Sequence, residues 1–162
     1  MRVPPPVLMA LAAGVQRAMT PTATARSPLR TAVAAGLLGG SIATAGAASR
    51  RFRRSGTTFE PFHPDRASVL VTTGANAVTR NPMYVGMAGL LVAQAVHRGS
   101  WAALLPAAAF VAVVDVYQVR FEEDALRTLF GADYDGYCAA VPRWLDARSV
   151  RAVTGRPGST TV

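Results

Sequence analysis

The stretch VTRNPMYVG, residues 78–86, places polar side chains directly before a long apolar run. Asn81 is a residue type favoured at helix N-caps, and Pro82 suits the first position of a helix. The start of a helix presents unpaired N–H groups and a positive potential, so it attracts anions. With Arg80 beside it and the Tyr84 hydroxyl close by, this stretch is a candidate carboxylate or phosphate site, although the same residues also serve simply to begin a helix.

Three acids follow another apolar run, within VRFEEDALRTLFG at 119–131: Glu122, Glu123 and Asp124. Ion pairs between residues four apart on a solvated helix account for two of the acids, and the candidate pairs are Glu123–Arg127 and Arg120–Asp124. Glu122 is left over, and Asp115 lies seven residues before it on the same helical face. Because an ionisable side chain is costly to bury at membrane level, these two acids indicate a functional site as readily as a structural one.

The composition offers little for metal or redox chemistry. The single cysteine, Cys138, excludes an internal disulfide, and the imidazoles are His63 and His97. These residues do not form a cluster with metal-ligand spacing, so no metal site is predicted. All 17 basic residues are arginine, against 9 acids, which gives a net charge of +8. No zinc-ligand spacing, aromatic RNA-binding pattern or basic zipper accompanies the arginines, so we expect no nucleic-acid partner.

The elements that must position these residues are helices. The 162 residues suit one domain, and 51% of them are apolar, mostly small residues that pack closely in lipid. Apolar runs predict helices at about 4–19, 31–49, 82–97 and 101–130. We therefore expect an all-α integral membrane bundle of about four transmembrane helices with a cytoplasmic C-terminal helical extension. Residues 1–150 would form a single domain, and the Gly-, Ser- and Thr-rich residues 151–162 a disordered tail.

The first apolar run, 4–19, allows two interpretations. It follows a basic residue, and TATA at 22–25 could serve as the small-residue cleavage site of a signal peptide. However, Gln16 and Arg17 interrupt the apolar region, and a triple proline opens it. These features favour a retained first helix over a cleaved signal.

The next two runs suggest how the helices pack. Gly36 and Gly40 form a G-x-x-x-G in run 31–49, which lets another helix approach closely, either within one chain or between two. Run 82–97 extends only about 24 Å at 1.5 Å per residue, against roughly 30 Å for a hydrocarbon core. The start of that helix should therefore lie recessed below the membrane surface.

The arginines predict an orientation. Six lie in 50–80 and another six in 120–156, and cytoplasmic segments carry the excess of positive charge. Both termini are therefore expected inside, with the short connections near Arg26 and Arg98 outside. The stretch YDGYCAAVPRWL, 134–145, has the aromatic and basic residues of a segment that lies along a membrane interface.

The motifs in their order resemble a known family. TTG, then TRNPMYVG, then a short apolar hairpin, then VRFEEDALRTLFGADYDGYCAAVPRWL is similar to the isoprenylcysteine carboxyl methyltransferase and phospholipid methyltransferase group of integral membrane enzymes. The resemblance extends from about residue 56 to residue 145. Two positions depart from it: Asn81 stands where the carboxyl methyltransferases usually have histidine, and Gln118 stands where the family has an arginine.

The resemblance implies S-adenosylmethionine as methyl donor, held in a helical membrane bundle. Carried over by position, the cofactor-binding residues are Leu70, Val71, Asn81, Pro82, Met83, Tyr84, Glu122 and Glu123. Catalytic roles fall on Arg80 and Glu122, and substrate binding on Arg120. Carboxylates of this kind accept hydrogen bonds from an amino group or a ribose, and the helix start at Asn81 suits the cofactor's carboxylate.

The function expected from this resemblance is methyl transfer to a lipophilic small molecule, a prenyl-type carboxylate or a lipid head group, on the cytoplasmic side of the cytoplasmic membrane. Two alternatives stay open: a membrane NADPH-dependent reductase of similar fold, and a non-enzymatic membrane protein whose arginine loop binds anionic lipid. The identity of the methyl acceptor, O- versus N-methylation and the oligomeric state are left undetermined by the sequence.

Overall fold

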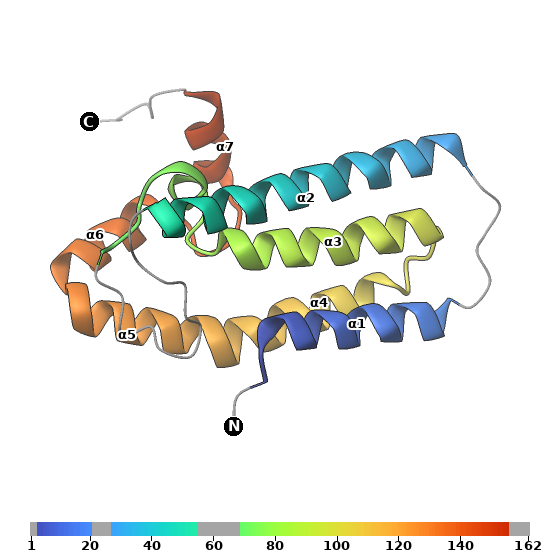
Figure 1. The fold of residues 1–162 in the computed structure, drawn as a ribbon, viewed down its shortest axis with the longest axis horizontal. Coiled ribbons are helices and arrows are strands. Elements are labelled where there is room, and N and C mark those ends of the chain that lie inside the picture. The colour runs from blue at the N-terminus through green and yellow to red at the C-terminus, as the bar shows by residue number, and fades with distance from the viewer. Residues whose placement is uncertain (1–2, 21–26, 55–68, 156–162) are drawn as a thin grey trace.

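The computed structural model of the chain describes residues 3–20, 27–54 and 69–155, and these form helices joined by short loops (Figure 1). The elements in chain order are α1 (Pro5–Met19), α2 (Pro28–Arg54), the short 3₁₀ helix η2 (Gly74–Ala77), α3 (Pro82–Arg98), α4 (Leu104–Val114), the π-helical turn η3 (Asp115–Val119), α5 (Arg120–Phe130), α6 (Ala132–Ala140) and α7 (Ala147–Thr154). No strand occurs in these ranges, so the predicted all-α class is confirmed.

The helices α1, α2 and α3 and the helix that runs from α4 into α5 lie roughly side by side in Figure 1. α2 packs along α3, α1 packs against α4 and α3, and α4 continues through η3 into α5. The continuous helix Leu104–Phe130 is the one helix, within the part of the chain that the structure describes, that is long and apolar enough to cross a membrane. Helix length and composition therefore support one span, and they do not by themselves establish the four that the apolar runs predict.

The closest helix contact lies between α2 and α3, where glycine makes room for a neighbouring backbone. A Cβ added at Gly86 would lie 2.9 Å from the Ser41 carbonyl oxygen and 3.0 Å from the Ala45 Cβ. By contrast, a Cβ at Gly36 or Gly40 would meet nothing within 4 Å. The G-x-x-x-G of α2 is thus not used for close packing within the described chain. The close approach is made instead by the small residues of α3.

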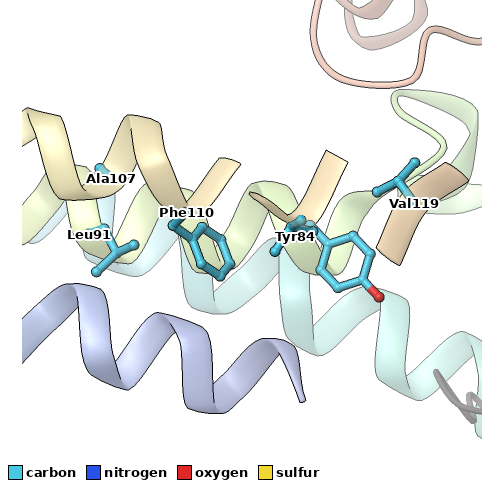
Figure 2. Packing of buried hydrophobic residues seen from close by; sticks show 6 residues of the cluster. Tyr84, Leu91, Ala107, Phe110 and Val119 are labelled. Carbon is cyan, nitrogen blue, oxygen red and sulfur yellow. The ribbon is translucent and has the colours of Figure 1, made fainter. Parts of the chain in front are cut away.

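Apolar side chains from α3 and the long helix form the main core (Figure 2). Its buried members are Tyr84, Leu91, Ala107, Phe110, Val114 and Val119. Partly buried residues of α1 cover this cluster on one side. Tyr84 lies in the first turn of α3, so its burial fixes the start of that helix against the region where α4 passes into α5.

Polar side chains join α1 to the rest of the bundle. The Gln16 amide is fully buried and donates to the carbonyl oxygens of Leu91, at 3.0 Å, and Ala103, at 2.6 Å. The Gln94 amide donates to the Ala13 carbonyl at 3.1 Å. Gln16, which interrupts the apolar run in the sequence, is therefore a contact between helices.

The C-terminal boundary differs from the prediction. Residues 151–154 belong to α7, whereas they were expected to begin a disordered tail; residues 156–162 lie outside the described part of the chain. α7 forms because Asp146 caps it. The Asp146 carboxylate accepts from the Arg148 N–H at 2.7 Å, and the Asp146 N–H donates to the Ser149 hydroxyl oxygen at 3.2 Å. Residues 55–68, within the arginine-rich segment 50–80, likewise lie outside the described residues.

Substituting Gly86→Ala should lower the free energy of unfolding by about 1–3 kcal/mol, because the added methyl overlaps the α2 backbone. Gly40→Ala is the matched control, since its methyl enters open space and alanine is the better helix former. Thermal unfolding followed by circular dichroism measures both. Equal melting temperatures for the two variants would contradict the proposed close contact.

Candidate functional site

A buried hydrogen-bonded group joins the first turn of α3 to the long helix. The Tyr84 hydroxyl donates to Glu122 Oε1 at 2.6 Å, and the Gln118 amide donates to the same oxygen at 2.8 Å. Tyr84 and Gln118 are almost completely buried. The structure thus brings two of the predicted site residues, Tyr84 and Glu122, into direct contact across the hairpin.

Glu123, the next residue, lies in a separate network of ion pairs. Its carboxylate is buried and binds Arg80 Nη2 at 2.7 Å and Arg143 Nη2 at 2.6 Å. The predicted surface pair of Glu123 with Arg127 is therefore wrong. Arg127 instead pairs with Asp135 at 2.9 Å and, more loosely, with Asp124 at 3.8 Å.

The π-helical turn η3 decides which acid shares a face with Asp115. Two turns of α-helix take about seven residues, and a π-helical turn takes up roughly one more. Asp115 therefore lies over Glu123, eight residues on, rather than over Glu122 as the sequence spacing suggests. Both Asp115 and Glu123 bind Arg143, the first at 3.3 Å.

Arg80 holds the end of α6 as well as Glu123. Its Nη1 donates to the carbonyl oxygens of Cys138, at 3.1 Å, and Val141, at 2.8 Å, and its backbone N–H donates to the Pro142 carbonyl at 2.9 Å. These carbonyls lie at the C-terminal end of α6, where helix geometry leaves them without backbone partners. In this structure the guanidinium of Arg80 is therefore occupied mainly by the protein itself.

Residues near the C-terminus form hydrogen bonds with the loop before α3. The Arg143 carbonyl accepts from the Thr79 hydroxyl at 2.9 Å and from the Asn81 amide at 3.0 Å, and the Ser149 hydroxyl donates to the Val78 carbonyl at 2.7 Å. Asn81 occupies the N-cap position of α3 as predicted, but its side chain makes no capping hydrogen bond. Tertiary contact with Arg143 has replaced the local cap.

The other predicted residues lie around this loop. Val71 and Pro82 are buried, Met83 is half-buried, and Leu70 packs against a second apolar cluster formed by Tyr134, Tyr137 and Val141. Arg120, the predicted substrate-binding residue, is exposed. Within the described residues, no group of three or more His, Cys, Asp or Glu could hold a metal ion.

Two residues of the network had been assigned to membrane anchoring by sequence reasoning. Arg143 joins Asp115 and Glu123, and the Trp144 indole N–H donates to Asp115 at 2.7 Å. The sequence does offer one indication of this network: an arginine and a tryptophan, both hydrogen-bond donors, follow Asp115 and the glutamates at positions 143 and 144. Spacing alone could not show that the chain folds back to bring them together.

The electrostatics keep this end of the bundle in one protonation state near neutral pH. The hydrogen bond to Glu123, with the charge of Asp115 added, raises the pKa of Arg143 above its usual range. Burial raises the pKa of Tyr137 to about 12, so its hydroxyl stays protonated and donates to the Asn76 carbonyl at 2.7 Å. Neither residue is suited to exchange a proton with a substrate at pH 7.

Comparison with known proteins identifies the family. The family model described as phospholipid methyltransferase matches residues 29–133, which is about two thirds of the chain. The chain belongs to the phospholipid methyltransferase family. This confirms the resemblance to the isoprenylcysteine and phospholipid methyltransferases. No curated protein and no solved structure gives a significant match.

The phospholipid methyltransferase match covers α2, α3 and the long helix, so it includes Arg80, Tyr84, Glu122 and Glu123. It ends early in α6 and leaves out α1, Arg143 and α7. The family is one of membrane-associated methyltransferases that act on lipid or prenylcysteine acceptors. The contacts of Arg143 with Glu123 therefore join the family region to a segment beyond it.

Replacing Glu123 by glutamine should destabilise the fold by about 3 kcal/mol, because two arginines at this end lose their shared counter-charge. Asp124→Asn is the matched control, since Asp124 is 79% exposed and its pair with Arg127 is long; we expect a change below about 0.5 kcal/mol. Denaturant unfolding of both variants tests this. A Glu123→Gln variant as stable as the control would show that the network carries no net stability.

Proposed function

We propose that the protein transfers a methyl group from S-adenosylmethionine to a lipid-borne acceptor at the cytoplasmic side of a membrane. The observation that carries the proposal is the contact of Tyr84 with Glu122, at 2.6 Å. It joins the two motifs of the family region, the start of α3 and the acid pair of α5, into one polar group beside an apolar core.

The chemistry of this end of the bundle fits the cofactor. Two of the three buried polar atoms without a hydrogen-bond partner among the described residues lie at this end, the acceptor Asn76 Oδ1 and the donor Arg80 Nε. S-adenosylmethionine carries an amino group, a carboxylate and ribose hydroxyls, which can supply the matching donors and acceptors. The Glu122 carboxylate accepts hydrogen bonds from Tyr84 and Gln118. A negative carboxylate also suits a cationic ligand.

The cofactor residues in this proposal are Leu70, Val71, Asn81, Pro82, Met83, Tyr84 and Glu122, all at the site end of the bundle. Glu123 contributes by position: its carboxylate is used by arginines, so it orders the loop that carries Asn81 and leads into α3. Arg120, which is exposed, remains the candidate for contact with an anionic acceptor, and Arg80 remains a proposed catalytic residue.

When bound, the cofactor supplies an electrophilic methyl group, and transfer is an in-line displacement. The protein's task is then to align the acceptor with that methyl and to exclude water. A carboxylate acceptor is already ionised near pH 7 and needs no base, whereas an amine must first lose a proton. The Tyr84–Glu122–Gln118 group would serve to orient the bound ligand.

The placement in a membrane is supported by the distribution of side chains on the bundle. No charged residue occurs in 3–16, 31–49, 82–96 or 99–114. Large apolar side chains point outward along these segments, among them Val7, Leu11, Val15, Val33, Ile42 and Leu105, while Gln16 and Ser41 are buried. Apolar residues outside and polar residues at helix contacts are the arrangement expected of a bundle in lipid.

The ends of the bundle suggest its orientation. Arg17, Arg30 and Arg98 lie where α1 ends, α2 begins and α3 ends, which is one end of the bundle in Figure 1. The site end has more of them: Arg50, Arg80, Arg120, Arg127, Arg143, Arg148 and Arg151. Since cytoplasmic segments carry the positive excess, we place the site on the cytoplasmic side.

Glu122→Gln should weaken binding of S-adenosylmethionine by about tenfold or more, because it removes the negative charge yet keeps an acceptor for Tyr84. Titration calorimetry on the purified protein measures the affinity, with Asp124→Asn as the control that removes a neighbouring exposed charge. NADPH is titrated in parallel. Unchanged affinity in Glu122→Gln, or binding of NADPH alone, would contradict the proposed site.

Membranes that contain the protein should transfer labelled methyl from S-adenosylmethionine into the organic extract. Mass spectrometry then identifies the acceptor by a shift of one methyl group, and hydrolysis of the product separates ester from amine. Membranes with the Glu122→Gln variant provide the blank. If no label enters a broad panel of lipids and prenylated acids, the protein is not a lipid methyltransferase.

A further inference from the structure

A short amphipathic helix at the site end of the bundle has no part in the proposed reaction. α7 leaves Val150 63% exposed and Val153 72% exposed, and Leu145 just before it is 59% exposed. Residues three or four apart share a helix face, so the valines form one face and Arg148 and Arg151 another. Apolar and basic faces side by side are typical of a helix that lies at a lipid surface.

The orientation of the valine face is fixed, because side chains beside it and on the basic face bind the rest of the protein. Ser149 is 4% exposed, and its hydroxyl is bonded to the Val78 carbonyl at 2.7 Å. The Asp146 capping box fixes the start of the helix, and Arg148 is held by Asp146 and by the Ala139 carbonyl at 3.0 Å. Exposure of the valines is thus a property of the folded helix.

The position of α7 suits the surface of a bilayer. Figure 1 shows it at the periphery, outside α2 at the end where α3 begins, with its axis across the axes of the bundle helices. If the bundle crosses a membrane, this axis runs along the surface. The cytoplasmic leaflet carries anionic lipid, which complements Arg151 on an exposed face.

We infer that α7 is a membrane-surface helix whose valines enter the acyl-chain boundary and whose Arg151 contacts anionic head groups. The inference rests on the membrane placement proposed above and goes beyond it, since α7 lies outside the family region. Ser149 links the helix directly to the loop before Asn81. Docking of α7 on lipid therefore holds the candidate site at the level where a lipid-borne acceptor arrives.

The test uses the full chain in nanodiscs, with Cys138→Ser as background and one bimane-labelled cysteine at a time. Val153→Cys reports on the valine face. Ala152→Cys is the matched control, since Ala152 is exposed and lies about 160° around the helix from Val150. Ile42→Cys, 58% exposed on α2, reports on the lipid-facing side of the bundle. The discs contain acyl-brominated phosphatidylcholine, alone or mixed equally with phosphatidylglycerol.

We expect bromine to quench the labels at 153 and 42 and to leave the label at 152 unchanged. Adding phosphatidylglycerol should increase quenching at 153, and Arg151→Gln should remove that increase. Quenching at 42 without quenching at 153 would overturn the inference about α7 alone, whereas loss of quenching at both would also overturn the membrane placement. A label at 153 that is shielded from aqueous iodide yet not quenched by bromine would indicate a protein partner and overturn the lipid assignment.

Discussion

The carboxylate of Glu123, shared by Arg80 and Arg143, is the interaction on which the site end of the protein depends. Arginine offers five donors in a planar fork, so each guanidinium can hold this carboxylate and further groups at once. Arg80 also binds the last carbonyls of α6, and the backbone carbonyl of Arg143 receives Thr79 and Asn81. One buried acid thereby connects α5, the end of α6 and the loop that begins α3.

Adjacent residues on a helix point about 100° apart, and the pair Glu122–Glu123 uses that difference. Glu122 faces the core and receives Tyr84 and Gln118, whereas Glu123 faces the C-terminal segment and its arginines. The two acids thus have separate partners. Glu123 thereby orders the structure, and Glu122 is the acid that we propose to bind the cofactor.

The bundle around this end is built from small residues rather than large ones. Gly86 lets α3 approach the backbone of α2, and the buried amide of Gln16 ties α1 to α3 and to the α4 side of the hairpin. Many valines and leucines face outward, so few large apolar side chains pack between the helices. Close helix contact and buried hydrogen bonds are the terms that hold helices together when the surroundings are themselves apolar. The same surroundings would deliver a lipid-borne acceptor directly to the end where Tyr84 meets Glu122.

The sequence by itself determined the helical class, the approximate extent of the helices and the family. Apolar periodicity and the Asn81–Pro82 helix start are local properties, and α3 begins at Pro82 as they predict. Motif order along the chain was likewise sufficient to place it among the phospholipid methyltransferases. Local spacing also predicts an ion pair of Glu123 with Arg127, but in the described chain Arg127 pairs with Asp135. It further predicts close helix packing at Gly36 and Gly40, and no such packing occurs within the described chain.

Only the tertiary structure decided the partners of the acids. The π-helical turn rotates Asp115 into line with Glu123, and the chain must fold back after α6 before Arg143 and Trp144 can reach them. The same return of the chain brings the Arg143 carbonyl to Asn81, whose side-chain amide donates to it and does not cap α3. Propensity and periodicity act between residues a few positions apart, whereas a buried charge is stabilised by whichever opposite charge the fold brings within reach.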